Sequence, residues 1–140
     1  MAHKMGYEGL IYYGVAGSAA ATQLTNVRDV SYNLEPDKGD TTQRGTGAAP
    51  PIKSGRVVAV GVSIEWTMLE KTTDTALEAL KVAAFAGSPV AIRLKDYAAV
   101  KGYDGDCDLT AKKSEPIGGE QTWQFTATPN AELRAPQLYV

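Results

Sequence analysis

Four acidic residues in the C-terminal half have the spacing of a calcium-binding loop. Asp104, Asp106, Asp108 and Glu115 match the first, third, fifth and twelfth positions of an EF-hand loop, where carboxylates ligate Ca²⁺. Leu109, however, stands where that loop needs glycine for its sharp turn, and both flanks have a strand pattern rather than a helix pattern. We therefore expect no metal here and predict that the three aspartates lie along one solvent-facing side of a strand.

The residue types that perform nucleophilic catalysis are few. The chain has one histidine, His3, in a short polar N-terminal segment, so no structured Ser–His or Cys–His pair can be proposed. Its one cysteine, Cys107, falls on the apolar side of a predicted strand, where a buried, inert thiol is expected.

The Gly-Thr-Gly sequence at 45–47 lacks the lysine of a phosphate-binding loop. Glu65 could form a hydrolytic carboxylate pair with the aspartates, but the sequence predicts no apolar pocket around it. We expect neither an enzyme nor a bound cofactor.

Composition predicts one soluble domain spanning residues 1–140. The 14 basic and 16 acidic residues give a net charge of −2, which does not favour a nucleic-acid or anionic-lipid surface. A single cysteine excludes an internal disulfide framework and indicates synthesis in a reducing compartment. Without a signal peptide or an apolar run of about 20 residues, we expect synthesis in the cytosol and no membrane span.

The longest regular pattern covers residues 57–69, where apolar side chains alternate with small or polar ones. This period of two predicts a strand with one dry face, about 40 Å long at ~3.3 Å per residue. Burial of that face would contribute about 10 kcal/mol gross. The residues predicted to be dry are Val58, Val60, Val62, Ile64, Trp66 and Met68, and those predicted to face water are Gly61, Ser63, Glu65 and Thr67.

Five shorter segments and one helix complete the predicted domain. Alternating patterns predict strands at 10–13, 27–34, 90–94, 103–111 and 122–127, the last two joined as a hairpin. A helix is predicted at about 73–86, because Thr75 and Glu78 have capping-box spacing and Gly87 provides a stop.

A long loop is predicted at about 35–55, a segment with three prolines and four glycines. It is either a disordered surface loop or an arm that orders against a neighbouring subunit. The segments 1–8 and 129–140 are predicted terminal arms, and the apolar C-terminus is expected to dock on another surface. The candidate inter-subunit residues are Pro36, Asp37, Lys38, Arg44, Pro50, Pro51, Ile52, Leu138, Tyr139 and Val140.

The order of these elements resembles the tail tube proteins, or major tail proteins, of bacteriophages. The matching features are the long strand with its preceding loop at 35–69, the single helix, the hairpin at 103–128, and the run Glu-Pro-Ile-Gly-Gly-Glu-Gln-Thr-Trp at 115–123. The resemblance implies a mainly β fold: an antiparallel two-sheet sandwich or half-barrel with one flanking helix. It also implies assembly into stacked hexameric rings whose sheets join into one β-barrel around a DNA channel. The haemolysin-coregulated protein of type VI secretion is similar in plan.

The resemblance implies a structural virion protein, made in the host cytoplasm, whose tube conducts DNA without binding it specifically. Its implied partners are further copies of itself, tape measure and tail terminator proteins, and a sheath protein if the tail contracts. The alternatives are a small monomeric β-barrel ligand-binding domain, or a secretion-system tube protein. A wall that a polyanion passes should be neutral or acidic, because lysines and arginines would hold DNA through counterion release. The candidate lumen-lining residues are Ser63, Glu65, Asp104, Asp106, Asp108, Thr122 and Gln124, for which an ordinary solvated outer surface is the competing interpretation.

Overall fold

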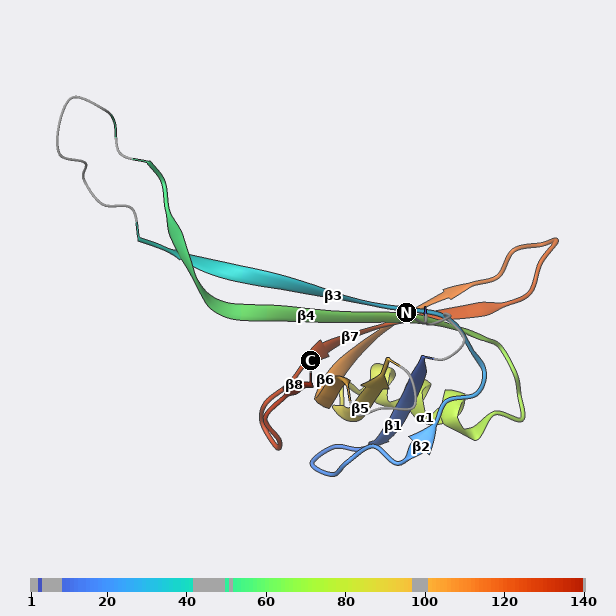
Figure 1. The fold of residues 1–140 in the computed structure, drawn as a ribbon. Coiled ribbons are helices and arrows are strands. Elements are labelled where there is room, and N and C mark those ends of the chain that lie inside the picture. Colours follow the sequence, from blue (N-terminus) through green and yellow to red (C-terminus); the bar gives the residue numbers. More distant parts are fainter. Residues whose placement is uncertain (1–2, 4–8, 42–49, 51, 97–100, 140) are drawn as a thin grey trace.

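The computed structural model describes residues 3, 9–41, 50, 52–96 and 101–139. Within them the chain is mainly β with one helix, as predicted (Figure 1). In chain order the elements are β1 (Leu10–Val15), β2 (Thr22–Gln23), β3 (Val27–Asp40), β4 (Gly55–Leu69), α1 (Thr75–Ala86), β5 (Val90–Lys95), β6 (Gly102–Ser114), β7 (Thr122–Pro129) and β8 (Gln137–Tyr139). None of the described helices is long and apolar enough to cross a membrane.

All strands belong to one antiparallel sheet with the order β2-β1-β5-β6-β7-β4-β3, and β8 also pairs with β6. The expected two-sheet sandwich is therefore corrected to a single open sheet, closer to the half-barrel alternative. The reason is the length of β6, which pairs with β5 through residues 104–107 and with β7 through residues 107–114. The sheet folds back on itself, so that β3 approaches the end of β5. A hydrogen bond shows this approach: the Tyr32 hydroxyl of β3 donates to Asp96, directly after β5, at 3.2 Å.

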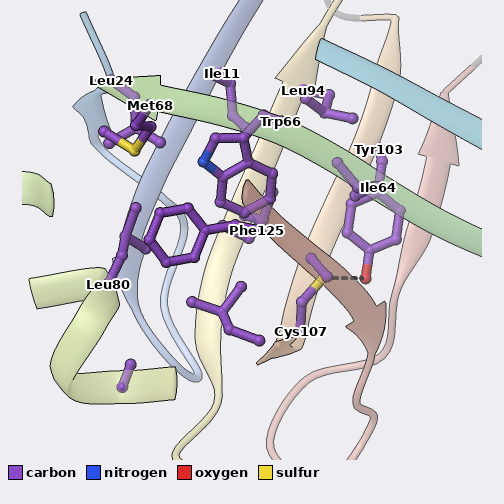
Figure 2. Close-up of a cluster of buried hydrophobic side chains, with 14 of the residues drawn as sticks. Ile11, Leu24, Ile64, Trp66, Met68, Leu80, Leu94, Tyr103, Cys107 and Phe125 are labelled. Carbon is purple, nitrogen blue, oxygen red and sulfur yellow. Dashed lines mark hydrogen bonds between the residues drawn. The ribbon is translucent and has the colours of Figure 1, made fainter. Parts of the chain in front are cut away.

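The core lies on the face of the sheet that α1 covers. Trp66 of β4 stacks on Phe125 of β7 (Figure 2), with ring centroids 5.6 Å apart. Leu77 and Leu80 of α1 are fully buried. Only half of the predicted dry face belongs to this core. Ile64, Trp66 and Met68 are buried, whereas Val62 is half-buried and Val58 and Val60 are exposed. The reason is that β7 pairs only with residues 64–69 of β4, so the earlier residues have β3 alone beside them.

The helix begins and ends close to its predicted limits, but its cap is a different residue. Asp74, not Thr75, is the N-cap, and its carboxylate accepts hydrogen bonds from the backbone N–H groups of Ala76 at 3.1 Å and Leu77 at 3.3 Å. Gly87 ends the helix in the left-handed conformation, with φ 71°. The capping-box interpretation of Thr75 and Glu78 is therefore wrong, although the helix that it predicted is confirmed.

Both ends of the predicted loop at 35–55 belong to the strands of a β-hairpin. β3 continues to Asp40 and pairs there with Gly55, so Pro36, Asp37 and Lys38 lie in a strand rather than a loop. Proline is tolerated because β3 is an edge strand, and the valines of β4 favour extended backbone. We call residues 34–40 and 55–61 the arm; Figure 1 shows it projecting beyond the rest of the sheet. Of the remaining candidates, Pro50 and Ile52 are exposed, and Arg44 and Pro51 lie outside the described residues.

The C-terminal segment also differs from the predicted arm. β8 pairs antiparallel with β6, with Gly102 opposite Tyr139, and Leu138 packs against the chain's own core. Gly105 permits this approach, since a Cβ there would lie 2.8 Å from Cα of Pro136. Leu138 and Tyr139 are therefore ordered by their own sheet, while Val140 and, except for the exposed His3, the predicted N-terminal arm at 1–8 lie outside the described residues.

Candidate functional site

The face of the sheet opposite the core is a broad polar surface, which we call the polar face. It is set by the register of β3, β4, β7 and β6, in which residues of one parity form rows that cross the strands. The rows are Ser31, Glu65, Thr126 and Thr110; Thr67, Gln124 and Lys112; and Leu69, Thr122 and Ser114. Serine, threonine and glutamine predominate in them, so the surface is strongly hydrophilic although it lies directly behind the core.

The register brings four of the candidate lumen residues onto this polar face. Glu65 lies opposite Thr126, Gln124 lies opposite Thr67, and Thr122 lies opposite Leu69. Ser63, two residues before Glu65, shares its side of β4 and lies opposite Asn33 of β3. Strand alternation predicted that each of these residues faces away from the core. The pairing of β4 with β7 brings them together on one face of the sheet.

The aspartate row of β6 is only partly open to solvent. Asp106 is 1% exposed, and its carboxylate accepts a hydrogen bond from the backbone N–H of Gly17 at 2.9 Å. Asp104 is half-buried and forms an ion pair with Arg134. Asp108 is exposed and accepts hydrogen bonds from the Asn130 side chain at 3.0 and 3.2 Å. The predicted continuous wet face is therefore wrong at Asp106, because the turn at Gly17 and the segment after β7 fold over this end of the sheet.

These contacts also separate the residues of the calcium-like pattern. Asp104, Asp106 and Asp108 each bind a different partner, and Glu115 forms an ion pair with Lys113 at 2.9 Å. Within the described part of the chain, no group of three His, Cys, Asp or Glu side chains could hold a metal ion. The sequence spacing therefore does not produce a convergent set of ligands.

The charged side chains of the polar face are mostly acidic. By register, Glu65 and Asp108 belong to it, and Glu35 and Asp37 continue it along the arm, whereas Lys112 provides positive charge. Acidic side chains therefore outnumber basic ones in these rows, although Arg56, opposite Gly39 in the arm, adds a second positive charge. The sequence-wide charge of −2 does not reveal this distribution.

Glu70, directly after β4, links α1 to the start of β7. Its carboxylate accepts hydrogen bonds from Lys81 of α1 at 2.8 Å and from the indole N–H of Trp123 of β7. The Lys81 and Lys113 ammonium groups both lie over the Trp123 ring, 5.0 and 5.5 Å from its centroid. The hydrogen bond from Lys81 lowers the pKa of Glu70, with further lowering from Trp123 and the nearby charges and partial opposition from burial. Sequence analysis missed this cluster, since its members are distant in sequence.

Inside the core, Cys107 has the environment of an unreactive thiol. Its Sγ donates a hydrogen bond to the Tyr103 hydroxyl at 3.4 Å (Figure 2). That hydroxyl donates to the backbone oxygen of Asp106 at 3.2 Å. Burial raises the pKa of the thiol to about 11, outweighing the opposite effect of the Tyr103 hydrogen bond. The prediction of a buried cysteine is confirmed.

A groove of about 820 Å³ separates β3 from the opposite edge of the sheet. Its walls come from β1, the segment around Leu24, the start of β3 and the end of β5, and it is bridged by the hydrogen bond from Tyr32 to Asp96. Burial, together with the negative charge and hydrogen bond of Asp96, raises the pKa of Tyr32. The groove marks the place where the folded-over sheet stays open.

Two backbone edges of the polar-face strands have no ladder partner among the described residues. β3 pairs with β4 on one side only. Residues 109–114 of β6 pair with β7 on one side, while β5 ends its pairing at Cys107. A four-stranded unit with a free edge on each side is open to pairing with other chains.

Comparison with known proteins finds likeness in structure alone. No family model and no curated protein matches the sequence. A chain from the tail of an empty GTA particle, solved with C6 symmetry, has a TM-score of 0.76 at 16% identity, covering 99% of this chain and 100% of that one. A chain from the virion of a native gene transfer agent particle has a TM-score of 0.70 at 13% identity, covering 99% and 100%. A chain of the SPP1 tail tube has a TM-score of 0.64 at 14% identity, covering 89% and 74%. The chain therefore has the fold of a tail tube protein.

Proposed function

We propose that this protein is a structural subunit that polymerises as stacked hexameric rings to form a phage-type tail tube. The observation that carries the proposal is the match over 99% of the chain, at a TM-score of 0.76, to a chain from a tail with C6 symmetry. The proposed role is mechanical rather than catalytic. The proposed location is the virion tail, after assembly in the host cytoplasm. The proposed partners beyond the chain itself are tape measure and tail terminator proteins and, if the tail contracts, a sheath protein.

The two free edges suggest how a ring closes. In our proposal the outer edge of β3 in one subunit pairs with the free edge of β6, residues 109–114, in the next. Each subunit then contributes the strands β3, β4, β7 and β6 to one continuous barrel, and closure removes the edges that a monomer leaves unpaired. Heterologous contacts of this kind generate rings when the rotation between copies closes.

In this arrangement the polar face lines the lumen. Ser63, Glu65, Thr122 and Gln124 would then surround the channel, and each carboxylate would recur once per subunit around every ring. A neutral to acidic wall suits the passage of DNA, because it offers few cations whose contacts with phosphates would release counterions. Asp104 and Asp106 contribute little to such a wall, since both already bind groups of their own chain.

Electron microscopy and light scattering of the purified protein test the assembly. We expect tubes, or six-membered rings, in equilibrium with subunits. A monomer at every concentration would contradict the proposal and favour the ligand-binding alternative. Mass spectrometry of purified phage particles separates the remaining alternative, because a secretion-system tube protein would be absent from virions.

Charge reversal tests the lumen assignment. Tubes of Glu65→Lys are expected to retain a short DNA duplex at low salt in a form protected from nuclease, and to release it as salt rises. Glu78→Lys on α1 is the matched control, since the Glu78 side chain is 54% exposed on the opposite side of the sheet and would hold DNA only where nuclease can reach it. Equal nuclease sensitivity of DNA on the two variants would place the polar face elsewhere.

A further inference from the structure

The last two turns of α1 present large apolar side chains that the chain itself does not cover. Val82 is 66% exposed and Phe85 is 97% exposed. Both border an apolar groove of about 460 Å³, whose other wall includes Ala111 of β6 and Trp123 of β7. We call Val82, Phe85 and this groove the α1 face. Adjacent apolar side chains beside an apolar groove are typical of a surface that contacts another protein.

The groove between β3 and the opposite edge of the sheet is a second uncovered surface, which we call the open groove. It has a volume of about 820 Å³, and the buried core residues Ile11, Leu24 and Leu94 line it. Gln23 and Thr25, which are exposed, lie at its rim. Core side chains are therefore reached through an opening that the described part of the chain leaves unfilled.

The α1 face and the open groove lie on the same side of the sheet, at its two free edges. Ala111 of the α1 face belongs to residues 109–114 of β6, which form one free edge, and the open groove borders the start of β3, which forms the other. Figure 1 shows α1, β1 and β2 together on one side of β3 and β4. The polar face lies on the other side.

One copy of the chain cannot bring its own α1 face into its own open groove. In the sheet, β7 and β4 lie between β6 and β3, so the two free edges are three strand spacings apart, about 14 Å at ~4.8 Å each. The core built around Trp66 and Phe125 fills the space beneath these strands. A second copy placed edge to edge, however, sets its α1 face directly beside the open groove.

We propose that the α1 face of one subunit docks into the open groove of its neighbour in the same ring. This inference rests on the proposed ring and adds a layer of side-chain contacts behind the ladder between β3 and β6. Each copy has one α1 face and one open groove, so a closed ring covers all of them with one repeated contact. The hydrogen bond from Tyr32 to Asp96 joins the two walls of the groove, which is therefore formed before a neighbour arrives.

The docking gives the ring a means of fixing its strand register. Backbone hydrogen bonds between two edge strands can form at several offsets, and it is the side-chain pattern that selects one of them. A neighbour displaced along β3 would keep part of its ladder but would leave Phe85 outside the groove. The contact therefore favours a single offset, and all subunits of the ring then lie at the same height.

Cross-linking of mixed single variants tests the contact directly. Phe85→Cys is mixed with Gln23→Cys or with Thr25→Cys, assembled and oxidised, and the native Cys107 does not interfere because it is buried. We expect disulfide-linked dimers in rings and tubes, and none in unassembled subunits at the same protein concentration. Ile117→Cys replaces Phe85→Cys in the matched control, since Ile117 is fully exposed in the β6–β7 turn outside the α1 face, and should give no cross-link. Rings that form with neither Phe85→Cys cross-link would overturn the proposal.

A surface variant provides the functional readout. Phe85→Ser is expected to keep the unfolding midpoint of the parent, because the side chain is almost fully exposed in the subunit. It should raise the protein concentration at which rings form by about tenfold or more, equivalent to roughly 1.4 kcal/mol per contact. Ile117→Ser is the matched control and should assemble like the parent.

Two results would overturn the docking while leaving the proposed function intact. One is normal ring formation by Phe85→Ser. The other is equal reactivity of Phe85→Cys toward a soluble maleimide in tubes and in subunits, which would place the α1 face on the open exterior of the tube. A parent protein that forms neither rings nor tubes would instead overturn the proposed function, and this inference with it.

Discussion

The substitution Glu70→Gln isolates the charge of the residue that ties α1 to β7. Glutamine keeps an acceptor for the Trp123 indole but converts the bond from Lys81, 2.8 Å long in the parent, into a neutral-acceptor one. Hydrogen bonds to charged groups contribute about 1.5–3 kcal/mol and neutral ones about 0.5–1.5 kcal/mol. The Glu70 side chain is 18% exposed, and Lys81 keeps Glu78 as a partner, so we expect a loss near the lower end, about 1 kcal/mol.

Urea denaturation at neutral pH measures this loss as a lower midpoint with an unchanged slope. In thermal unfolding, about 1 kcal/mol corresponds to a decrease in Tm of roughly 3–5 °C for a domain of this size. The matched control is Glu78→Gln, which removes the more exposed partner of Lys81 and should cost only about 0.3 kcal/mol.

The pH dependence provides a second, independent readout. Because the folded-state pKa of Glu70 is lowered, its stabilisation is complete above the unfolded pKa of about 4.3 and is lost as the pH falls through the folded pKa. The difference in stability between the parent and Glu70→Gln should therefore be constant from about pH 5.5 to 8 and shrink at lower pH. A Glu70→Gln effect no larger than that of Glu78→Gln, or one that persists unchanged in acid, would refute the reasoning.

Three further outcomes follow from the core and the C-terminal segment. Phe125→Ala should lower the free energy of unfolding by about 3–5 kcal/mol in urea titrations, since Phe125 is fully buried between Trp66 and Trp123; a loss below about 1 kcal/mol would contradict its central place. Gly105→Ala should speed amide hydrogen exchange in β8 more than in β7, because its Cβ would displace Pro136. Cys107 should resist alkylation at pH 8 in the folded state and react after unfolding, as burial raises the pKa of its thiol to about 11; rapid labelling of the native protein would show that the core is open.

Much of the fold follows from local patterns. Period-two alternation placed β1, β5, the β6–β7 hairpin and the buried half of β4, because burial on one side of a strand leaves a direct mark on the sequence. The helix was equally predictable from the sequence, since it ends at Gly87 in a left-handed conformation that favours glycine over other residues. The arm was not. Pro36 and Gly39 are turn-forming residues by type, and only their pairing with β4 keeps them extended.

The candidate site was less predictable because its properties depend on contacts between distant residues. The alternation of Asp104, Asp106 and Asp108 correctly assigns them to one side of β6, but the group that buries Asp106 is Gly17, 89 residues away. The exposure of Val58 and Val60 was unpredictable for the same reason. Their apolar character is evident from the sequence, but which residues of β4 pair with β7 depends on the register of the two strands. Trp123 and Glu70, 53 residues apart, offer no local signal of their contact.

The arm also affects how an assembly of this chain would start. Its two strands pair only with each other, with exposed side chains on both faces, so its free energy of local opening is far below that of the core. A subunit in solution must therefore lose conformational entropy to hold the arm straight before any contact compensates for it. In the proposed tube, an incoming subunit would order only its own arm on a ring that is already assembled, whereas two free subunits would have to order both. Growth from a seed should consequently be fast and spontaneous initiation slow, which gives a lag phase that added fragments of preformed polymer abolish.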